Sequence, residues 1–165
     1  MKKLNILIII LALIIIGLAI LLFIKFSFKI EQPNKTINLK VYFGNMALSA
    51  TNEQDECKRV YPVVRVVNKT PAVARASINE LLKGPTEQEK SQGYFSLIPT
   101  DSKLNSISIS NGLVLADFDA KTESGGGSCS MAGRVAQINS TLKQFDTVKT
   151  INLSINGRTG DIFQP

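Results

Sequence analysis

The sequence predicts an α+β domain that follows an N-terminal transmembrane helix. Three observations support this fold class. An apolar segment, residues 4–24, precedes the rest of the chain and is broken only by Asn5 and Gly17. Beyond it, segments with strand-like alternation are interspersed with two segments of helical periodicity. Their order, β-β-α-β-β-α-β, lacks regular βαβ alternation, which favours a small sheet packed by two helices.

The apolar segment is long enough to cross a membrane as a helix. At about 1.5 Å per residue it reaches about 30 Å, the thickness of the hydrocarbon core. A secretory signal peptide would have a shorter apolar region and a small-residue cleavage site, and neither is present. No cysteine lies near it, which excludes a lipid-modified N-terminus. We interpret residues 1–26 as an uncleaved signal anchor and residues 27–38 as a tether.

The positive charge of the chain is concentrated around this segment. The formal net charge is +6, from 19 basic and 13 acidic residues. Four lysines and no acidic residue lie within residues 1–30, so most of the excess flanks the anchor. Lys2 and Lys3 favour a cytoplasmic N-terminus, whereas Lys25 and Lys29 oppose it. We expect a C-terminal domain outside the cytoplasm and no nucleic-acid partner.

Two strands are expected at the start of the domain. Leu39, Val41 and Phe43 alternate with polar or amphipathic neighbours, which is typical of a half-buried strand. Residues 60–67 are apolar on both faces, which predicts an inner strand. Pro62 limits pairing there and places the start of the strand, or a bulge, near itself.

The first amphipathic helix is bounded by clear signals. Thr70 is the expected N-cap and Pro71 suits the first helical position. An apolar stripe follows at helical spacing, and Gly84-Pro85 ends the helix: Ala74, Ile78, Leu81 and Leu82. Residues 86–89, Thr-Glu-Gln-Glu, form a capping box that predicts a second, short helical turn.

A hairpin, a second helix and a final strand complete the fold. Residues 106–110 alternate, Asn111-Gly112 supplies the turn, and residues 113–118 form the returning strand. The second helix carries an apolar stripe and takes Ser128 or Ser130 as its N-cap: Met131, Val135, Ile138, Leu142 and Phe145. Residues 151–155 form the last strand.

The residue types argue against most catalytic chemistry. The chain contains no histidine, which removes histidine-based triads and metal ligands. Asp117 and Asp119 share one face of a strand near Glu123 and could bind a hard cation or share a proton, but a solvated strand end explains them better. The acidic run of residues 53–56 has the same alternative and lacks EF-hand spacing. We expect no catalytic residue, metal or cofactor.

A glycine-rich loop precedes the second helix. Gly125, Gly126, Gly127 and Ser128 could present backbone N–H groups to an anion at the helix N-terminus. The loop lacks the lysine of a Walker motif and the spacing of a dinucleotide fingerprint. The alternative is a flexible entry to the helix.

The two cysteines, Cys57 and Cys129, permit two interpretations. They could form a disulfide in an exported domain or remain two buried thiols. Cys129 lies near a helix start, where its pKa would fall, but a catalytic thiolate needs a base that the chain lacks. The nearby basic residues Lys58, Arg59, Arg65 and Lys69 are expected on a solvated face.

A series of short strings spans residues 39–157: Val41-Tyr42-Phe43, Cys57 with Pro62-Val63-Val64-Arg65, Glu80 to Thr86, Gly93-Tyr94, Ile98-Pro99, Gly125 to Cys129, Thr141-Leu142, Gln144-Phe145 and Ile155-Asn156-Gly157. In this order the strings resemble the GerMN domain family of bacterial envelope and spore germination proteins. The resemblance implies a non-enzymatic extracytoplasmic domain over residues 39–165, similar to ring-building motifs. It also implies a Cys57–Cys129 disulfide.

Two functions follow as expectations. The first is a membrane-anchored assembly module that contacts other envelope proteins or a second copy of itself, in a sporulation or germination setting. The second is a domain that binds a small anionic or glycan ligand of the cell envelope through Gly125 to Ser128.

Overall fold

The computed structural model describes residues 2–27, 35–49 and 56–164, and it divides the chain into two units, Met1–Asn34 and Lys35–Pro165. Helix α1 (Lys2–Ser27) includes the segment predicted to cross a membrane. Among the described residues, no helix is both long and apolar enough for a membrane span. The span over residues 4–24 therefore stays a prediction. Residues 28–34 of the predicted tether lie outside the described residues.

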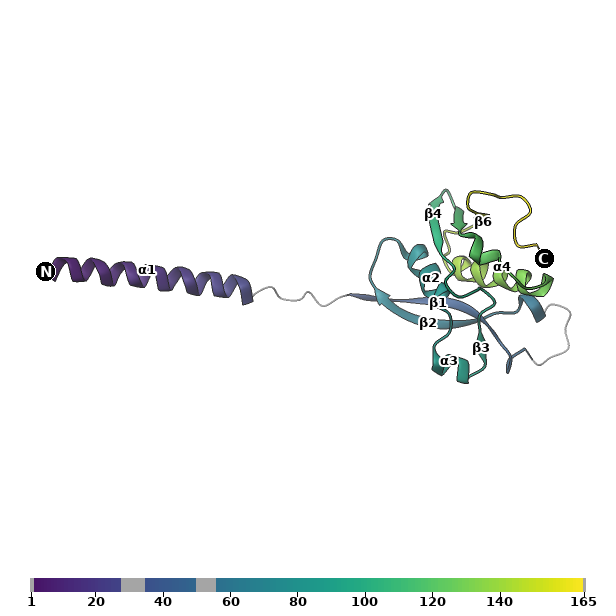
Figure 1. Ribbon diagram of the computed structural model, residues 1–165, viewed down its shortest axis with the longest axis horizontal. Helices are drawn as coiled ribbons and strands as arrows, with labels where there is room; N and C mark the ends of the chain where they lie inside the picture. Colours follow the sequence, from purple (N-terminus) through teal and green to yellow (C-terminus); the bar gives the residue numbers. More distant parts are fainter. Residues whose placement is uncertain (1, 28–34, 50–55, 165) are drawn as a thin grey trace. The chain divides into compact units, whose positions relative to one another are not determined.

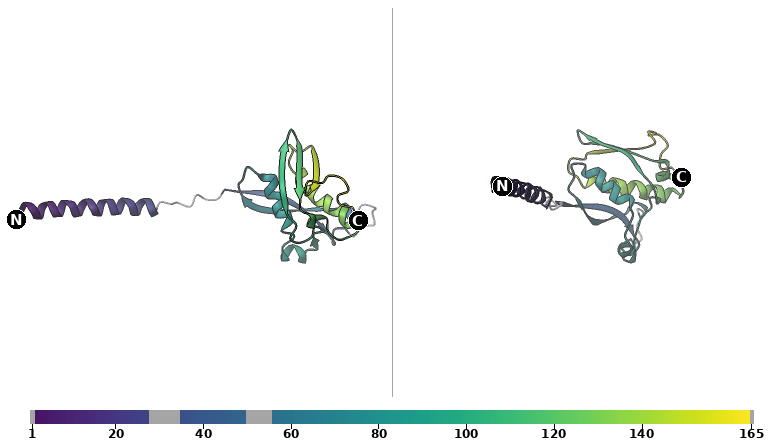
Figure 2. Two further views of the ribbon diagram at one scale, coloured as in Figure 1. Left: turned by 45° about the horizontal axis from the view of Figure 1, so that its top comes forward. Right: turned by 60° about the vertical axis from the view of Figure 1, so that its left-hand side comes forward.

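The second unit contains two three-stranded sheets with two helices between them (Figures 1 and 2). The strand orders are β2-β1-β3 and β4-β5-β6. The prediction of one small sheet was wrong. The strands form two separate sheets, and each sheet buries one face against helices α2 and α4. The elements are β1 (Thr36–Asn45), a 3-10 turn η1 (Glu56–Lys58), β2 (Tyr61–Asn68), α2 (Val73–Leu82), α3 (Glu87–Ser91), β3 (Tyr94–Phe95), β4 (Leu104–Ser110), β5 (Leu113–Phe118), a 3-10 turn η2 (Ala120–Glu123), α4 (Ser128–Lys143) and β6 (Thr150–Ile155).

The central strand of the first sheet is β1. It begins at Thr36, inside the predicted tether, and runs antiparallel to β2 with Leu39 opposite Arg65. Its other side pairs with β3 only at Gly44 and Asn45. Leu39, Val41 and Phe43 are at most 4% exposed and form the core under α2 and α4. The predicted alternation is therefore confirmed, in a strand longer than expected.

Side chains of the α4 C-terminal end complete the second side of β1. The Lys40 backbone N–H donates to Gln144 Oε1 at 2.8 Å, and Gln144 Nε2 donates to the Lys40 carbonyl at 2.7 Å. The Tyr42 N–H donates to Thr141 Oγ1 at 3.2 Å. An amide side chain thus takes the place of a peptide group in a neighbouring strand, and it attaches α4 to the sheet.

Strand β2 is an edge strand, so the expectation of an inner strand was wrong. Its residues alternate between half-buried and exposed, and Val64 and Val66 are 57% and 67% exposed. Because Lys40 and Tyr42 direct their backbone groups toward α4, their partners Val64 and Pro62 direct theirs away from β1. Pro62 lacks an N–H where that group would face outward. It therefore costs the sheet no hydrogen bond.

The helix signals were accurate in type and less so in position. Helix α2 begins at Val73, later than expected, because Thr70 Oγ1 accepts the Ala72 N–H at 3.1 Å and forms a turn ahead of the helix. The capping box of α3 is confirmed: Thr86 Oγ1 accepts the Glu89 N–H, and the Glu89 carboxylate accepts the Thr86 N–H.

The second sheet contains the predicted hairpin. Asn111 and Gly112 both have positive φ, 50° and 83°, as the two-residue turn requires. Strand β6 lies parallel to β5, with α4 in the crossover between them. The inner face of this sheet is buried against the helices: Val114, Ala116, Phe118 and Ile155 are at most 2% exposed.

Replacing Gln144 with alanine should lower the free energy of unfolding by about 1–2 kcal/mol, because two hydrogen bonds to Lys40 are lost. Urea unfolding followed by tyrosine fluorescence measures this change, since all three tyrosines lie in the second unit. Gln88→Ala, at an exposed position of α3, is the matched control and should stay within about 0.5 kcal/mol. Equal effects of the two substitutions would contradict this role of Gln144.

Candidate functional site

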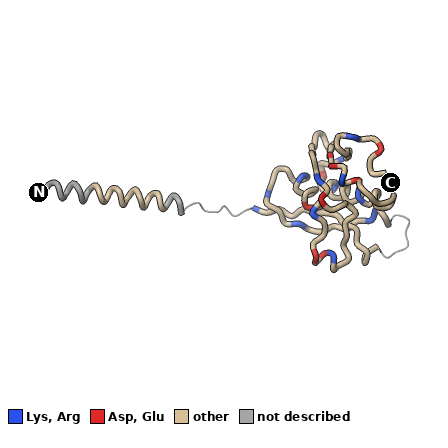
Figure 3. Tube along the Cα trace, viewed as in Figure 1, with Lys and Arg blue, Asp and Glu red and all other residues tan. Residues whose placement is uncertain are grey.

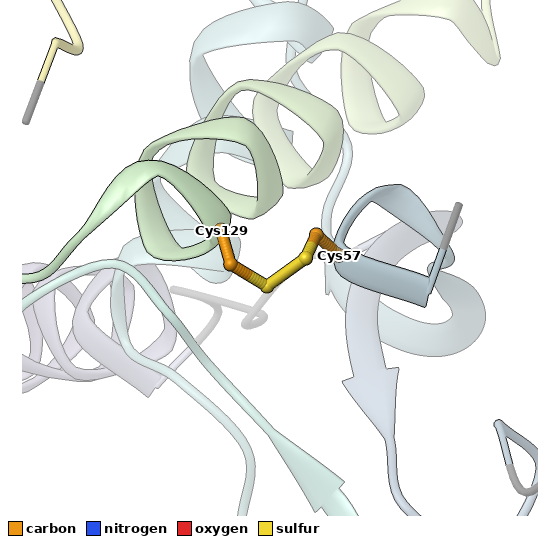
Figure 4. The surroundings of a disulfide bond; sticks show 2 residues. All are labelled: Cys57 and Cys129. Carbon is orange, nitrogen blue, oxygen red and sulfur yellow. A yellow bond between two sulfur atoms is a disulfide. The ribbon is translucent and has the colours of Figure 1, made fainter. Parts of the chain in front are cut away.

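The disulfide joins the first turn of α4 to the turn η1 (Figure 4). Cys57 and Cys129 are bonded with a Cα–Cα separation of 5.0 Å, so the predicted pairing is confirmed. Close packing of the two elements depends on Gly133 of α4. A Cβ there would come within 2.8 Å of the Cys57 carbonyl oxygen and even closer to the Leu97 side chain. Cys129 is an exposed residue and Cys57 is half-buried.

The glycine-rich loop lies immediately before the disulfide in sequence. Gly125 and Gly126 have positive φ, 62° and 92°, and Gly127 is the N-cap of α4 in place of the expected serines. Gly127 offers no side chain to the first-turn N–H groups, and that turn contains no acidic residue. Residues 125–128 are all exposed. The three glycines of the loop therefore offer a ligand only backbone groups and no side chain that could recognise it.

A buried arginine holds this loop from inside the domain. Arg134 is 4% exposed, and its guanidinium donates to the carbonyl oxygens of Leu97 at 2.8 Å, Thr122 at 3.3 Å and Gly125 at 2.6 Å. Burial lowers the pKa of Arg134 from its ordinary value. The sequence does place Arg134 on the apolar stripe of this helix, between Met131 and Ile138. A buried cation at such a position needs hydrogen-bond acceptors from within the domain.

The acidic residues that could have bound a cation are used in the fold instead. Asp117 accepts hydrogen bonds from Ser154 Oγ at 2.6 Å, the Gly157 N–H at 2.7 Å and Asn105 Nδ2 at 2.9 Å. The Ser154 hydroxyl and then the Gly157 N–H hold the pKa of Asp117 below its ordinary value of 3.8.

Asp119 caps η2 by accepting from Thr122, and Glu123 pairs with Arg158. The predicted acidic run falls largely on residues 50–55, outside the described residues. Within the described ranges, no group of three or more acidic or cysteine side chains could hold a metal ion. The side chains near Asp117 thus serve to join strands and turns.

A second charged cluster joins β2 to helices α2 and α3. Arg65, expected on a solvated face, has a side chain only 13% exposed. It donates to Glu89 Oε2 at 2.6 Å and to the Gly84 carbonyl at 3.3 Å, and lies 4.0 Å from Glu80 Oε2. Burial alone would raise the pKa of Glu89, but the hydrogen bonds from Arg65 and the Thr86 N–H lower it. This cluster unites two of the family-like strings in space.

A cavity of about 430 Å³ lies beside the disulfide. Its lining combines the disulfide with the side chains of Met46, Phe95 and Leu97, and Arg59 is its one charged residue among those described. The amide of Gln137 in its wall already accepts from Leu97 N and donates to the Phe95 carbonyl, each at 3.3 Å. The described walls therefore offer no pair of nucleophile and base.

The sequence profile described as "Germane: Sporulation and spore germination" matches residues 40–161, most of the chain. The chain belongs to the Germane family. This confirms the resemblance to GerMN domains, and the matched residues fall within the unit that carries both sheets. No curated protein shows significant similarity to the chain.

Solved structures share this fold. The first GerMN domain of the sporulation protein GerM from Bacillus subtilis has a TM-score of 0.55 and 20% identity, covering 78% of this chain and 92% of that domain. The tandem GerMN domains of the same protein give a TM-score of 0.52 and 20% identity, with 76% of this chain and 41% of that one covered. A putative lipoprotein from Clostridium perfringens gives 0.50 and 18%, with 78% and 80% covered.

Reducing the disulfide should lower the free energy of unfolding by about 4 kcal/mol, because the bond closes a loop with a sequence separation of 72 residues. Urea unfolding with and without reductant measures the change. A double Cys57→Ser/Cys129→Ser variant should match the reduced protein and ignore reductant. Intact mass without reductant should be lower by two hydrogen atoms than with reductant, and two freely alkylated thiols would contradict the bond.

Because of Asp117, the free energy of unfolding of the domain should fall as the pH is lowered into the acid range. Its pKa is lower in the folded protein, so its contribution is full above pH 3.8 and is lost as the pH falls through the folded value. Replacing Asp117 with asparagine should cost about 1.5–3 kcal/mol near neutral pH and flatten the acid decline. Urea unfolding at several pH values tests this, with the exposed Asp146→Asn as control. An unchanged acid profile in the Asp117 variant would contradict the assignment.

Proposed function

We propose that this chain is a single-pass membrane protein that displays one Germane domain outside the cytoplasm, where it assembles with other envelope proteins without catalysing a reaction. The observation that carries this proposal is how the domain uses its side chains. The charged groups Arg65, Arg134 and Asp117 are engaged in holding the fold. Large apolar side chains remain on its surface, among them Val64, Val66 and Leu115. Such a surface suits protein contact.

The charge pattern of the domain also favours protein partners. Lysine and arginine are interspersed with aspartate and glutamate over the second unit (Figure 3). A nucleic-acid binder would concentrate basic residues on one face to neutralise phosphates. The mixed pattern supports recognition by shape and apolar contact.

The proposed location has two supports. The apolar segment over residues 4–24 has the length and composition of a signal anchor. The Cys57–Cys129 disulfide suits an oxidising compartment outside the cytoplasm. Membership of the Germane family adds a sporulation or germination setting to the proposal.

In-cell crosslinking followed by mass spectrometry tests the assembly role. The tagged full chain should capture a defined envelope protein or a second copy through residues 35–165, and a control with residues 1–34 alone should not. External protease should digest the domain of intact spheroplasts. A chain that crosslinks to no protein, or a domain protected from protease, would contradict the proposal.

The alternative, an anionic or glycan ligand at Gly125 to Ser128, is favoured by one observation. The buried Arg134 guanidinium binds the Gly125 carbonyl and places positive charge beneath a helix turn free of acid. Inorganic phosphate and soluble wall fragments should then raise the melting temperature of the full chain by mass action. Gly126→Ala should abolish that rise. An unchanged melting temperature with all these compounds would contradict the alternative.

A further inference from the structure

The free edge of β2 has its hydrogen-bonding groups directed away from the domain. Lys40 uses both backbone groups on Gln144, so it cannot form a hydrogen-bonded pair with Val64. By alternation, Pro62, Val64, Val66 and Asn68 all direct their backbone groups outward. The sheet order gives β2 one paired strand, β1, so these groups have no partner strand within the described chain.

The side chains at this edge are apolar, whereas those further into the sheet are polar. On the outer face Val64 lies opposite Lys40, and Val66 lies opposite Asn38. An edge strand that faces water usually carries lysine or another charged side chain as protection against pairing. In this sheet the usual distribution of side chains is reversed: the valines lie on the edge strand β2, and the polar residues lie on the inner strand β1. This is the pattern of a sheet that continues.

We propose that two copies of this chain pair through the free edges of their β2 strands, antiparallel and about a two-fold axis at Arg65. This inference rests on the proposed assembly function and gives it a surface. Val64 of one copy then lies opposite Val66 of the second copy, and each pair exchanges two backbone hydrogen bonds. Four valines form one apolar strip on the outer face, bordered by the polar residues of the two β1 strands.

The charge distribution around this edge is compatible with a second copy as the occupant. The outward face of β2 carries no charged side chain from Pro62 to Asn68, so two copies meet without repulsion there. The two Arg65 residues face each other across the axis on the inner side. Each is already bonded to Glu89 of its own chain and lies beside its own Glu80, which removes the like-charge penalty.

Mixed crosslinking tests both the contact and its register. Full-length Val64→Cys and Val66→Cys chains, kept in mild detergent so that α1 is retained, are mixed and treated with a short bismaleimide. The mixture should give a 64–66 crosslinked dimer whose yield rises with concentration. Leu115→Cys is the matched control because Leu115 is 49% exposed on the other sheet, and it should give no specific dimer.

A charge exchange tests the same register without cysteines. Val66→Lys should weaken dimer formation at least about tenfold, because a lysine then enters the apolar strip. Since Val66 is 67% exposed, the melting temperature of the dilute monomer should not change. Adding Val64→Glu chains should restore a mixed dimer, with glutamate opposite lysine. Leu115→Lys should leave wild-type association intact.

Absence of the 64–66 crosslink at every concentration would overturn the inference, as would equal crosslinking at Leu115 or no effect of Val66→Lys. These failures are distinct from failure of the proposed function. If the full chain captures another envelope protein in cells while β2 forms no dimer, assembly stands and the self-pairing edge is rejected.

Discussion

The hydrogen bonds between Gln144 and the backbone of Lys40 fix the arrangement of the first sheet. They close the side of β1 that β3 leaves open, and they anchor the C-terminal end of α4 on the strand that carries Leu39, Val41 and Phe43. They also set the direction in which every backbone group of β1 points. Because β2 pairs with β1 in one register, the same contact decides that Val64 and Val66 turn their backbone groups to the outside.

The buried charged side chains of the domain also join elements of the fold. Arg134 satisfies three backbone carbonyl oxygens beside α4, and Arg65 joins β2 to helices α2 and α3. Removing either arginine would leave its acceptors without a hydrogen-bond partner, which lowers the free energy of unfolding. A catalytic centre needs polar groups that are held in place yet free to react. Here the best-held polar groups have their hydrogen bonds filled, which supports the assembly role proposed for the domain.

Features with local causes could be predicted from the sequence, whereas those set by distant residues could not. The Asn111-Gly112 turn and the Thr86 capping box depend on neighbouring residues alone, and both are confirmed. The division into two sheets depends on β3 reaching β1 from a distant part of the chain. The apolar run of residues 60–67 indicated burial, and only pairing shows that half of it is exposed at an edge. In the candidate site the disulfide was predicted, and the roles of Arg134 and Asp117 required the folded contacts.

The same geometry explains why pairing through β2 would stop at two copies. A sheet that adds strands at both edges grows without limit, whereas a two-fold contact through β2 alone is closed. In each copy the far side of β1 is occupied by the two-residue strand β3 and by Thr141 and Gln144. Pro62 marks one end of the free edge, because it has no N–H to donate to a longer ladder. Pro62 therefore limits the free edge of β2, while Gln144 covers the opposite side of β1, and together they allow a dimer and oppose a fibre.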